Sequence, residues 1–78
     1  MAIPKDVLDG RHPGVVQIAR YFDAAHLPEG VLRWTSQACA ELAADMIVEL
    51  PDGPELTAGL RKLLEAKDCF VRAALDVS

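Results

Sequence analysis

Lys67 stands at a position where the sequence pattern predicts an apolar core residue. Leu60, Leu63 and Phe70 fall on one face of a predicted helix, and Lys67 lies on that same face between the last two. Moving a lone ammonium group out of water costs several kcal/mol unless a partner faces it. The chemistry that this position suggests is the binding of an anionic group such as a phosphate.

The hydroxyl groups of Thr35 and Ser36 are the predicted counterpart of this lysine. Residues 50–54 read Leu-Pro-Asp-Gly-Pro, a dense turn signal between two helical segments. A short turn between long helices predicts an antiparallel hairpin, which places the lysine opposite the region around Gln37, close to both hydroxyl groups. Together they would form an anion site near the open end of the hairpin.

Other roles for Lys67 remain open at this point. Its aliphatic stem can cover apolar surface while the ammonium reaches water, and a polar residue in a helical seam can fix register or oligomeric state. The counter-charge can also come from Glu41 or Asp68 instead of a ligand. In a ligand site, Arg33 or Arg72 would supply a second positive charge.

Three aromatic residues flank the corner between the first two predicted helices. Tyr21, Phe22 and Trp34 could stack on a nucleobase, as aromatic residues do in single-strand binders, or they could simply be the larger pieces of the core. His26 completes this set as a candidate ligand contact, and a hydrogen bond within the corner is its simpler role.

Catalytic and metal-binding patterns are weak. Cys39 and Cys69, taken with His12 and His26, lack the close pairs typical of zinc ligands, so we expect small buried thiols in a reducing compartment and no metal site. The sequence contains no nucleophilic triad, no Gly-rich phosphate loop and no HExxH pair. We therefore expect a protein that is not an enzyme and carries no cofactor.

The chain reads as one all-α domain of 78 residues, a short N-terminal helix packed on a long antiparallel αα-hairpin. Pro13, Pro28 and Pro54 each suit the first turn of a helix, where the missing N–H is not needed. The predicted elements are an irregular lead-in over 1–12 and helices over 13–25, 28–49 and 54–75.

The charge distribution limits the partners. The formal net charge is −4, which argues against DNA or RNA as a partner, although residues 61–72 contain four bases and two acids. No apolar run approaches the ~20 residues that span a membrane, and the N-terminus lacks the apolar core of a signal peptide. We expect a cytoplasmic protein.

Self-association is a further expectation. A core of this size stabilises a fold only marginally, and small chains often depend on oligomers. Several apolar side chains look difficult to cover within three helices: Leu42, Ile47, Val48, Leu63, Val71 and Leu75.

The segment His26-Leu27-Pro28 and the run from Leu50 to Leu75 resemble a group of short phage-encoded proteins. More distantly, the chain is similar to the helical-hairpin domain shared by the anti-CBASS and anti-Thoeris cyclic-nucleotide sponges, through its size, its helical order and the pattern G-L…V-R-A in the last helix. The D-x-R-W-type segment of the sponges is not present, and Trp34 lies in a different context.

This resemblance implies a phage immune-evasion protein that sequesters a cyclic di- or trinucleotide without cleaving it. Sponges of this kind are often hexamers that hold the ligand between subunits. Thr35 and Lys67 or Arg72 would then contact phosphates, and Tyr21 a base. The alternative is a small helical oligomer that serves as a protein–protein interaction or structural module without a small ligand.

Overall fold

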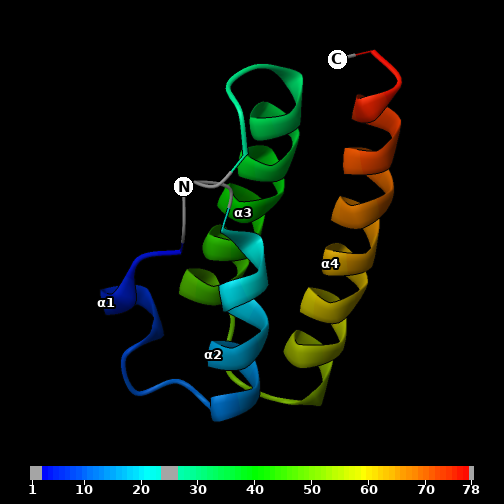
Figure 1. Ribbon diagram of the computed structural model, residues 1–78. Helices are drawn as coiled ribbons and strands as arrows, with labels where there is room; N and C mark the ends of the chain where they lie inside the picture. Colours follow the sequence, from blue (N-terminus) through cyan, green and yellow to red (C-terminus); the bar gives the residue numbers. More distant parts are fainter. Residues whose placement is uncertain (1–2, 24–26, 78) are drawn as a thin grey trace.

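The computed structural model describes residues 3–23 and 27–77, and these form helices without any strand. The elements are α1 (Lys5–Leu8), α2 (Pro13–Ala19), the 3-10 helix η1 (Arg20–Phe22), α3 (Val31–Glu49) and α4 (Pro54–Leu75). The all-α prediction is confirmed for the described part of the chain. Helices α3 and α4 stand side by side and antiparallel, joined by the short turn at the lower end in Figure 1.

Helix α4 has the bounds that the sequence predicted. Pro54 is the first helical residue, where its missing N–H is harmless, and Glu55 places a carboxylate in the first turn, where it favours the helix dipole. Leu56 and Leu60 are buried along the inner face of the helix. The long helix therefore positions Lys67 two turns above Leu60.

Helix α3 starts three residues later than predicted. Gly30 has a φ of 115°, a conformation that favours glycine and is incompatible with an α-helix, so Pro28 lies outside the helix and Val31 begins it. The predicted range 28–49 is wrong at its N-terminal end and correct at Glu49. The chain turns at Glu29 and Gly30 before it enters α3.

The predicted helix over 13–25 is also wrong in part. Helix α2 ends at Ala19, a single 3-10 turn carries Arg20–Phe22, and Asp23 is extended. The tighter turn buries the ring of Phe22 completely. The carbonyl of Tyr21, which a continuing α-helix would use for its own i to i+4 bond, instead accepts a hydrogen bond from Lys67 Nζ.

The predicted irregular lead-in contains a helical turn. Pro4 precedes the four residues of α1, and Ile3 is buried while Val7 and Leu8 pack against the core. These three apolar side chains recur at helical spacing, so they lie on one side of the turn and pack together against the core.

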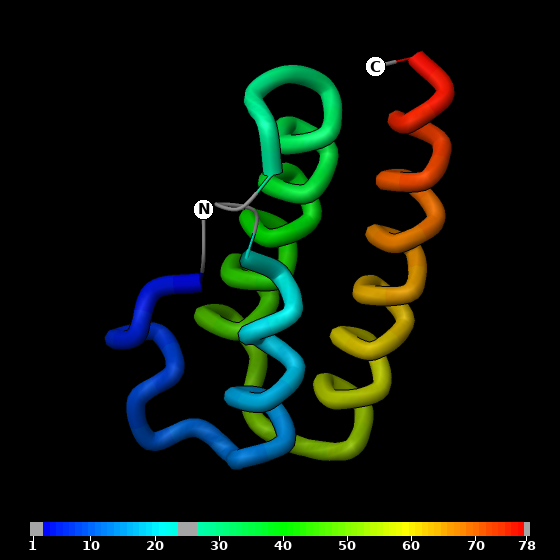
Figure 2. The backbone as a smooth tube through the Cα atoms, viewed as in Figure 1, coloured from blue at the N-terminus to red at the C-terminus, as the bar shows by residue number. Residues whose placement is uncertain are grey.

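The core lies between the hairpin and the α2–η1 segment, which covers one face of α3 and α4 (Figure 2). Val15, Phe22 and Ile47 are fully buried, and Leu60 is 2% exposed. The expectation that Ile47 would be difficult to cover is therefore wrong. Val15 and Phe22 belong to the same buried cluster as Ile47.

Arg11 holds the N-terminal segment to the turn between α3 and α4. Its guanidinium donates to Asp52 Oδ1 at 2.7 Å and to the carbonyls of Ile47 and Leu50, and the backbone N–H of His12 donates to Asp52 Oδ2 at 2.8 Å. The carbonyl oxygens at a helix C-terminus need such partners. Arg11 thereby satisfies the end of α3 and fixes α2 over the hairpin.

Candidate functional site

The ammonium of Lys67 is engaged by the protein. The side chain is 13% exposed, and Nζ lies 2.8 Å from the Tyr21 carbonyl oxygen, 3.5 Å from Asp68 Oδ1 and 6.0 Å from the centre of the Phe22 ring. The stem crosses apolar surface and the head reaches a carbonyl and a carboxylate at its edge. This geometry ties α4 to η1 and leaves the charge with partners inside the chain.

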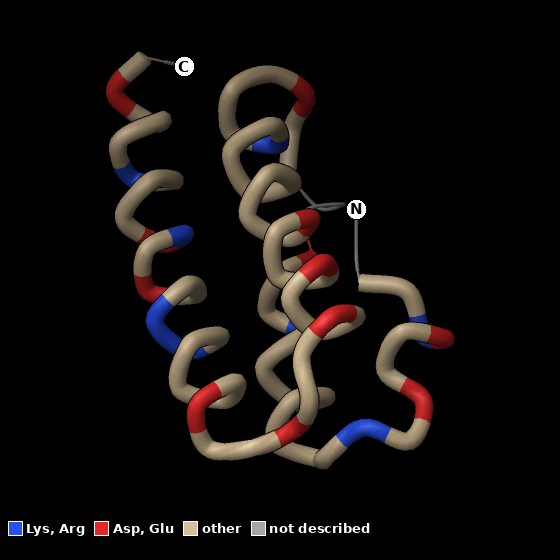
Figure 3. Tube along the Cα trace, turned by 180° about the vertical axis from the view of Figure 1, so that it is seen from behind, with Lys and Arg blue, Asp and Glu red and all other residues tan. Residues whose placement is uncertain are grey.

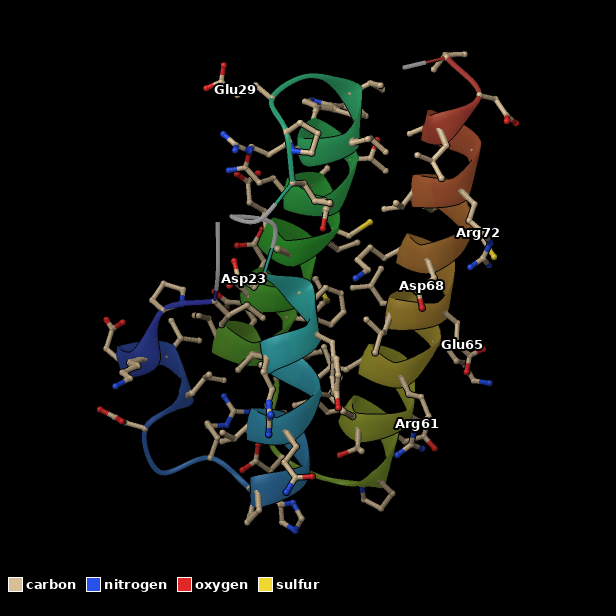
Figure 4. All side chains as sticks on the ribbon, viewed as in Figure 1. Asp23, Glu29, Arg61, Glu65, Asp68 and Arg72 are labelled. Atoms are coloured by element: carbon tan, nitrogen blue, oxygen red, sulfur yellow. The ribbon has the colours of Figure 1, made fainter. Side chains whose placement is uncertain are left out.

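Three of the predicted ligand-binding residues lie around one small cleft on the same side. Ser36, Lys67 and Arg72 line it, together with the carboxylates of Asp23 and Asp68, and its volume is about 200 Å³. Figure 4 shows Asp68 and Arg72 one turn apart on α4, with Asp23 below the start of α3. We refer to this feature as the Lys67 cleft.

The electrostatics of the Lys67 cleft are mixed. Two acids balance its two bases, and Arg72 also donates to Cys69 Sγ at 3.4 Å. Pockets that bind small molecules usually have volumes of about 300–1,000 Å³. In a single chain, the Lys67 cleft is thus large enough for one phosphate but too small for the nucleobases of a cyclic nucleotide as well.

The structure separates the predicted hydroxyl pair. Ser36 is 1% exposed and faces the Lys67 cleft, whereas Thr35 lies on the other side of the hairpin. Thr35 Oγ1 donates to the carbonyl of Val31 at 2.6 Å, one turn earlier in its own helix. Adjacent helical residues point about 100° apart, so only one of the two can face Lys67.

The remaining predicted contacts do not converge on the cleft. Both Arg33 Nε and Nη2 donate to the Leu27 carbonyl, at 2.9 and 2.6 Å, and Arg33 Nη1 lies 3.6 Å from Glu29. The Tyr21 ring is 61% exposed and pairs with the guanidinium of Arg20 at 5.9 Å. His26 lies outside the described residues.

The opposite face of the hairpin carries an apolar groove between α3 and α4. Near the turn, a pocket of about 450 Å³ is lined by Leu42, Met46, Leu50, Leu56, Gly59 and Leu63. Near the open end, a pocket of about 490 Å³ is lined by Trp34, Thr35, Ala38, Cys39, Phe70 and again Leu42 and Leu63. We refer to the two together as the α3–α4 groove.

The sequence explains how the groove arises. On α3, Trp34, Ala38, Leu42, Met46 and Leu50 recur every four residues, which forms a stripe beside the buried positions of the helix. Large apolar side chains on this stripe stay exposed: Trp34 by 68%, Leu42 by 47% and Leu50 by 44%. The sequence predicted that Leu42, Val48 and Leu75 would be difficult to cover, and all three are exposed. It did not predict that Leu42 and Leu63 join Trp34 and Phe70 in one groove.

Acidic residues border the groove on the α3 side. Glu41, Asp45 and Glu49 are exposed on α3 and recur every four residues, in the row next to the apolar stripe. Figure 3 shows acidic positions on the side of α3 that is turned away from α4. The pocket near the turn also includes Glu55, whereas no described charged residue lines the pocket near the open end. The groove is thus acidic at one end and aromatic at the other.

The two cysteines differ in their surroundings. Cys39 is buried beside the groove, and this burial raises the pKa of its thiol more than the charge of Lys67 lowers it. A raised pKa keeps the thiol protonated and unreactive. Cys69 is exposed on α4, so the prediction of a buried thiol is correct for Cys39 and wrong for Cys69. Within the described residues, no group of three or more His, Cys, Asp or Glu gathers that could hold a metal ion.

Comparison with known proteins gives no relative. No protein-family model, curated protein or solved structure matches this chain. Among the described residues, no helix combines the length and the apolar character needed to cross a membrane. The function must therefore be argued from the two faces of the hairpin.

Proposed function

We propose that this protein is a small non-catalytic interaction module that assembles with a second copy of itself through the α3–α4 groove. The observation that carries the proposal is the gathering of Trp34, Leu42, Leu50 and Phe70 on one face, each between 44% and 68% exposed. Large contiguous apolar patches on a small soluble domain mark interaction sites. The groove is such a patch, and α2 leaves it uncovered.

The solvent-accessible surface area of the chain supports the presence of a surface that a partner would cover. A folded monomer of 8.4 kDa is expected to expose about 4,600 Å² from the scaling of surface with mass. This chain exposes 5057 Å², roughly a tenth more. The excess agrees with an elongated molecule of 38 × 21 × 17 Å whose hairpin is covered on one face only.

The size of the groove fits a dimer contact. From Trp34 to Leu50 it extends over about 24 Å at 1.5 Å per residue, and two adjacent helices are about 20 Å wide. The footprint is therefore about 500 Å² per copy, so two copies bury about 1,000 Å², which is the lower bound for specific protein interfaces. A self-associating module of moderate affinity is the expected result.

A matched pair of substitutions on α3 tests the proposal. Leu42 lies in the middle of the groove, whereas Val48 is 60% exposed outside it. Leu42→Glu buries a carboxylate in the interface and should convert the assembly into a monomer with unchanged helix content. Val48→Glu should leave the assembly intact. Sedimentation velocity and circular dichroism measure the two properties.

A monomeric chain at high concentration would reject the proposal. If the unmodified chain sediments as an 8.4 kDa monomer at hundreds of micromolar, the groove does not bind a second copy. Equal loss of assembly in Leu42→Glu and Val48→Glu would also contradict it, because the contact would then lie elsewhere.

A second candidate function is the sequestration of a cyclic di- or trinucleotide by a phage immune-evasion protein. The observation that favours it is the gathering of Ser36, Lys67 and Arg72 around one cleft, where a phosphate could replace Asp68 beside the ammonium. Since the cleft holds only about 200 Å³, the bases would have to contact another subunit. The groove lies on the other face, so this contact would need a further subunit beside the one bound at the groove.

Thermal unfolding with a panel of cyclic di- and trinucleotides tests this candidate. A ligand that binds only the folded state raises the melting temperature by mass action. Lys67→Met should abolish the shift, and Lys62→Met, an exposed position on the same helix, should retain it. If no member of the panel shifts the melting temperature of the unmodified chain, the candidate is wrong.

A further inference from the structure

From the proposed self-association, we infer that the second copy docks antiparallel, on a two-fold axis that passes over Leu42 and Leu63. These two residues line both pockets and mark the middle of the groove. A two-fold contact uses the same surface on both partners and places residues equally far before and after the axis opposite each other. Trp34 then faces Leu50 of the second copy, and Phe70 faces its Leu56.

Shape favours this orientation because the two ends of the groove differ. At the open end Trp34 and Phe70 are 68% and 55% exposed and stand out from the helices. At the turn end the groove contains Gly59, where an added Cβ would meet nothing within 4 Å. Aromatic side chains bury about 150–250 Å² each when a pocket receives them. Antiparallel docking brings each aromatic end onto the turn-end pocket of the other copy, which has a volume of about 450 Å³.

Charge at the turn end favours the same orientation, although antiparallel docking also lays the two α3 helices, with their acidic edges of Glu41, Asp45 and Glu49, over each other. Glu55 lines the pocket at the turn end and Glu49 borders it, whereas the pocket at the open end lacks charged lining among the described residues. The other two-fold arrangement lays α3 of one copy over α4 of the second, turn end on turn end, and collects all four carboxylates. Like charges this close repel each other. Antiparallel docking keeps the two acidic ends apart.

Disulfide trapping distinguishes the two arrangements. Single cysteines are introduced as Leu42→Cys and as Leu63→Cys in a Cys69→Ser background, and Cys39 is retained because it is buried with a raised thiol pKa. Antiparallel docking places two copies of position 42 together on the axis. Mild oxidation of an equimolar mixture should therefore give dimers linked through position 42 on both chains. A Val48→Cys chain, modified outside the groove, should stay unlinked.

The alternative arrangement gives a different product. With α3 over α4, position 42 faces position 63 of the second copy, and mixed 42–63 disulfides would overturn the antiparallel orientation while the proposed self-association survives. Sedimentation of the unmodified chain as a monomer would instead reject the self-association itself. A dimer by sedimentation without any 42–42 link would again overturn the orientation alone.

The fluorescence of Trp34, the one tryptophan in the sequence, provides a second measurement. Its emission should move to shorter wavelength as the concentration rises and the ring leaves water. Within one chain, Trp34 and Leu50 lie at opposite ends of α3, about 24 Å apart. Leu50→Ala should therefore alter the emission of the concentrated sample and leave that of the diluted monomer unchanged. An equal emission in both variants at high concentration would contradict antiparallel docking.

Discussion

The two faces of the α3–α4 hairpin carry similar apolar residues, but one face buries them and the other exposes them. On the face covered by α2 and η1, Val15 and Phe22 are completely buried, and the ammonium of Lys67 finds partners within the chain. On the face with the groove, Trp34 and Phe70 are more than half exposed. The closed face holds the fold together, and the open face provides the surface that our proposal assigns to assembly. Changes on the two faces should accordingly separate stability from association.

The largest expected effect comes from exchanging a phenylalanine on each face. Phe22→Ala removes a fully buried ring and should lower the free energy of unfolding by about 3–5 kcal/mol. That is a large part of the roughly 5–15 kcal/mol of a typical domain. Phe70→Ala, at a 55% exposed site, should change the stability of the diluted monomer by less than about 1 kcal/mol and weaken association.

Urea unfolding in dilute solution measures the first effect and sedimentation the second. If Phe22→Ala fails to fold, Phe22→Leu provides a milder change, expected to lower stability by about 1–2 kcal/mol because most of the volume is retained. Equal losses of stability at positions 22 and 70 would show that the two faces do not differ in the way described.

Much of the fold could be predicted from the sequence. Pro54 and the apolar spacing from Leu56 onward define α4, and the Leu-Pro-Asp-Gly-Pro turn fixes the hairpin. These signals are local: proline geometry and helical periodicity act within a few residues. The start of α3 was missed because it depends on the positive φ of Gly30, and nothing in the neighbouring residues distinguishes that glycine from a helical one.

The candidate site was harder to predict, because it depends on contacts between distant segments. The sequence indicated correctly that Lys67 interrupts an apolar seam near Ser36, but it could not show that the Tyr21 carbonyl lies 2.8 Å from the ammonium. That contact follows from the 3-10 turn in η1. The sequence indicated that Leu42 and Leu63 would be difficult to cover, but not that they lie in one groove with Trp34 and Phe70, because periodicity gives the apolar face of each helix and not which part of it a third element covers.

The next effect in size concerns the contact between Lys67 and η1 on the closed face. Lys67→Met keeps the stem that covers apolar surface and loses the hydrogen bond to the Tyr21 carbonyl, so the free energy of unfolding should fall by about 0.5–1.5 kcal/mol. Lys62→Met, on the solvent side of α4, is the control and should change little. A gain in stability at position 67 would show that the contact with the carbonyl does not offset the desolvation of the ammonium.

Substitution of Gly59 should raise stability and not lower it, because Gly59 lies in the interior of α4 on the open face. A methyl group there meets nothing within 4 Å, so Gly59→Ala should raise the stability of the monomer by about 0.5–1 kcal/mol through helix propensity. Gly30→Ala is the contrasting control and should destabilise the chain, because φ is 115° at that position. A loss of stability in Gly59→Ala at high dilution would mean that this part of the groove is filled within the single chain.

The smallest expected effect is the pH dependence of the Arg11–Asp52 contact, which holds the N-terminal segment over the closed face. The backbone N–H of His12 and the side chain of Arg11 lower the pKa of Asp52 below its ordinary value of 3.8. A carboxyl group with a lowered folded-state pKa contributes stability above its unfolded pKa and loses it as the pH falls through the folded value. Asp52→Asn should therefore melt below the unmodified chain at neutral pH, and the difference should shrink below about pH 4.

Thermal unfolding between pH 2 and pH 7 measures this difference in melting temperature, with Asp45→Asn, at an exposed position on α3, as the control. A constant difference across this range would mean that Asp52 contributes through its shape and not through its charge, and the closed face would then be held by packing alone.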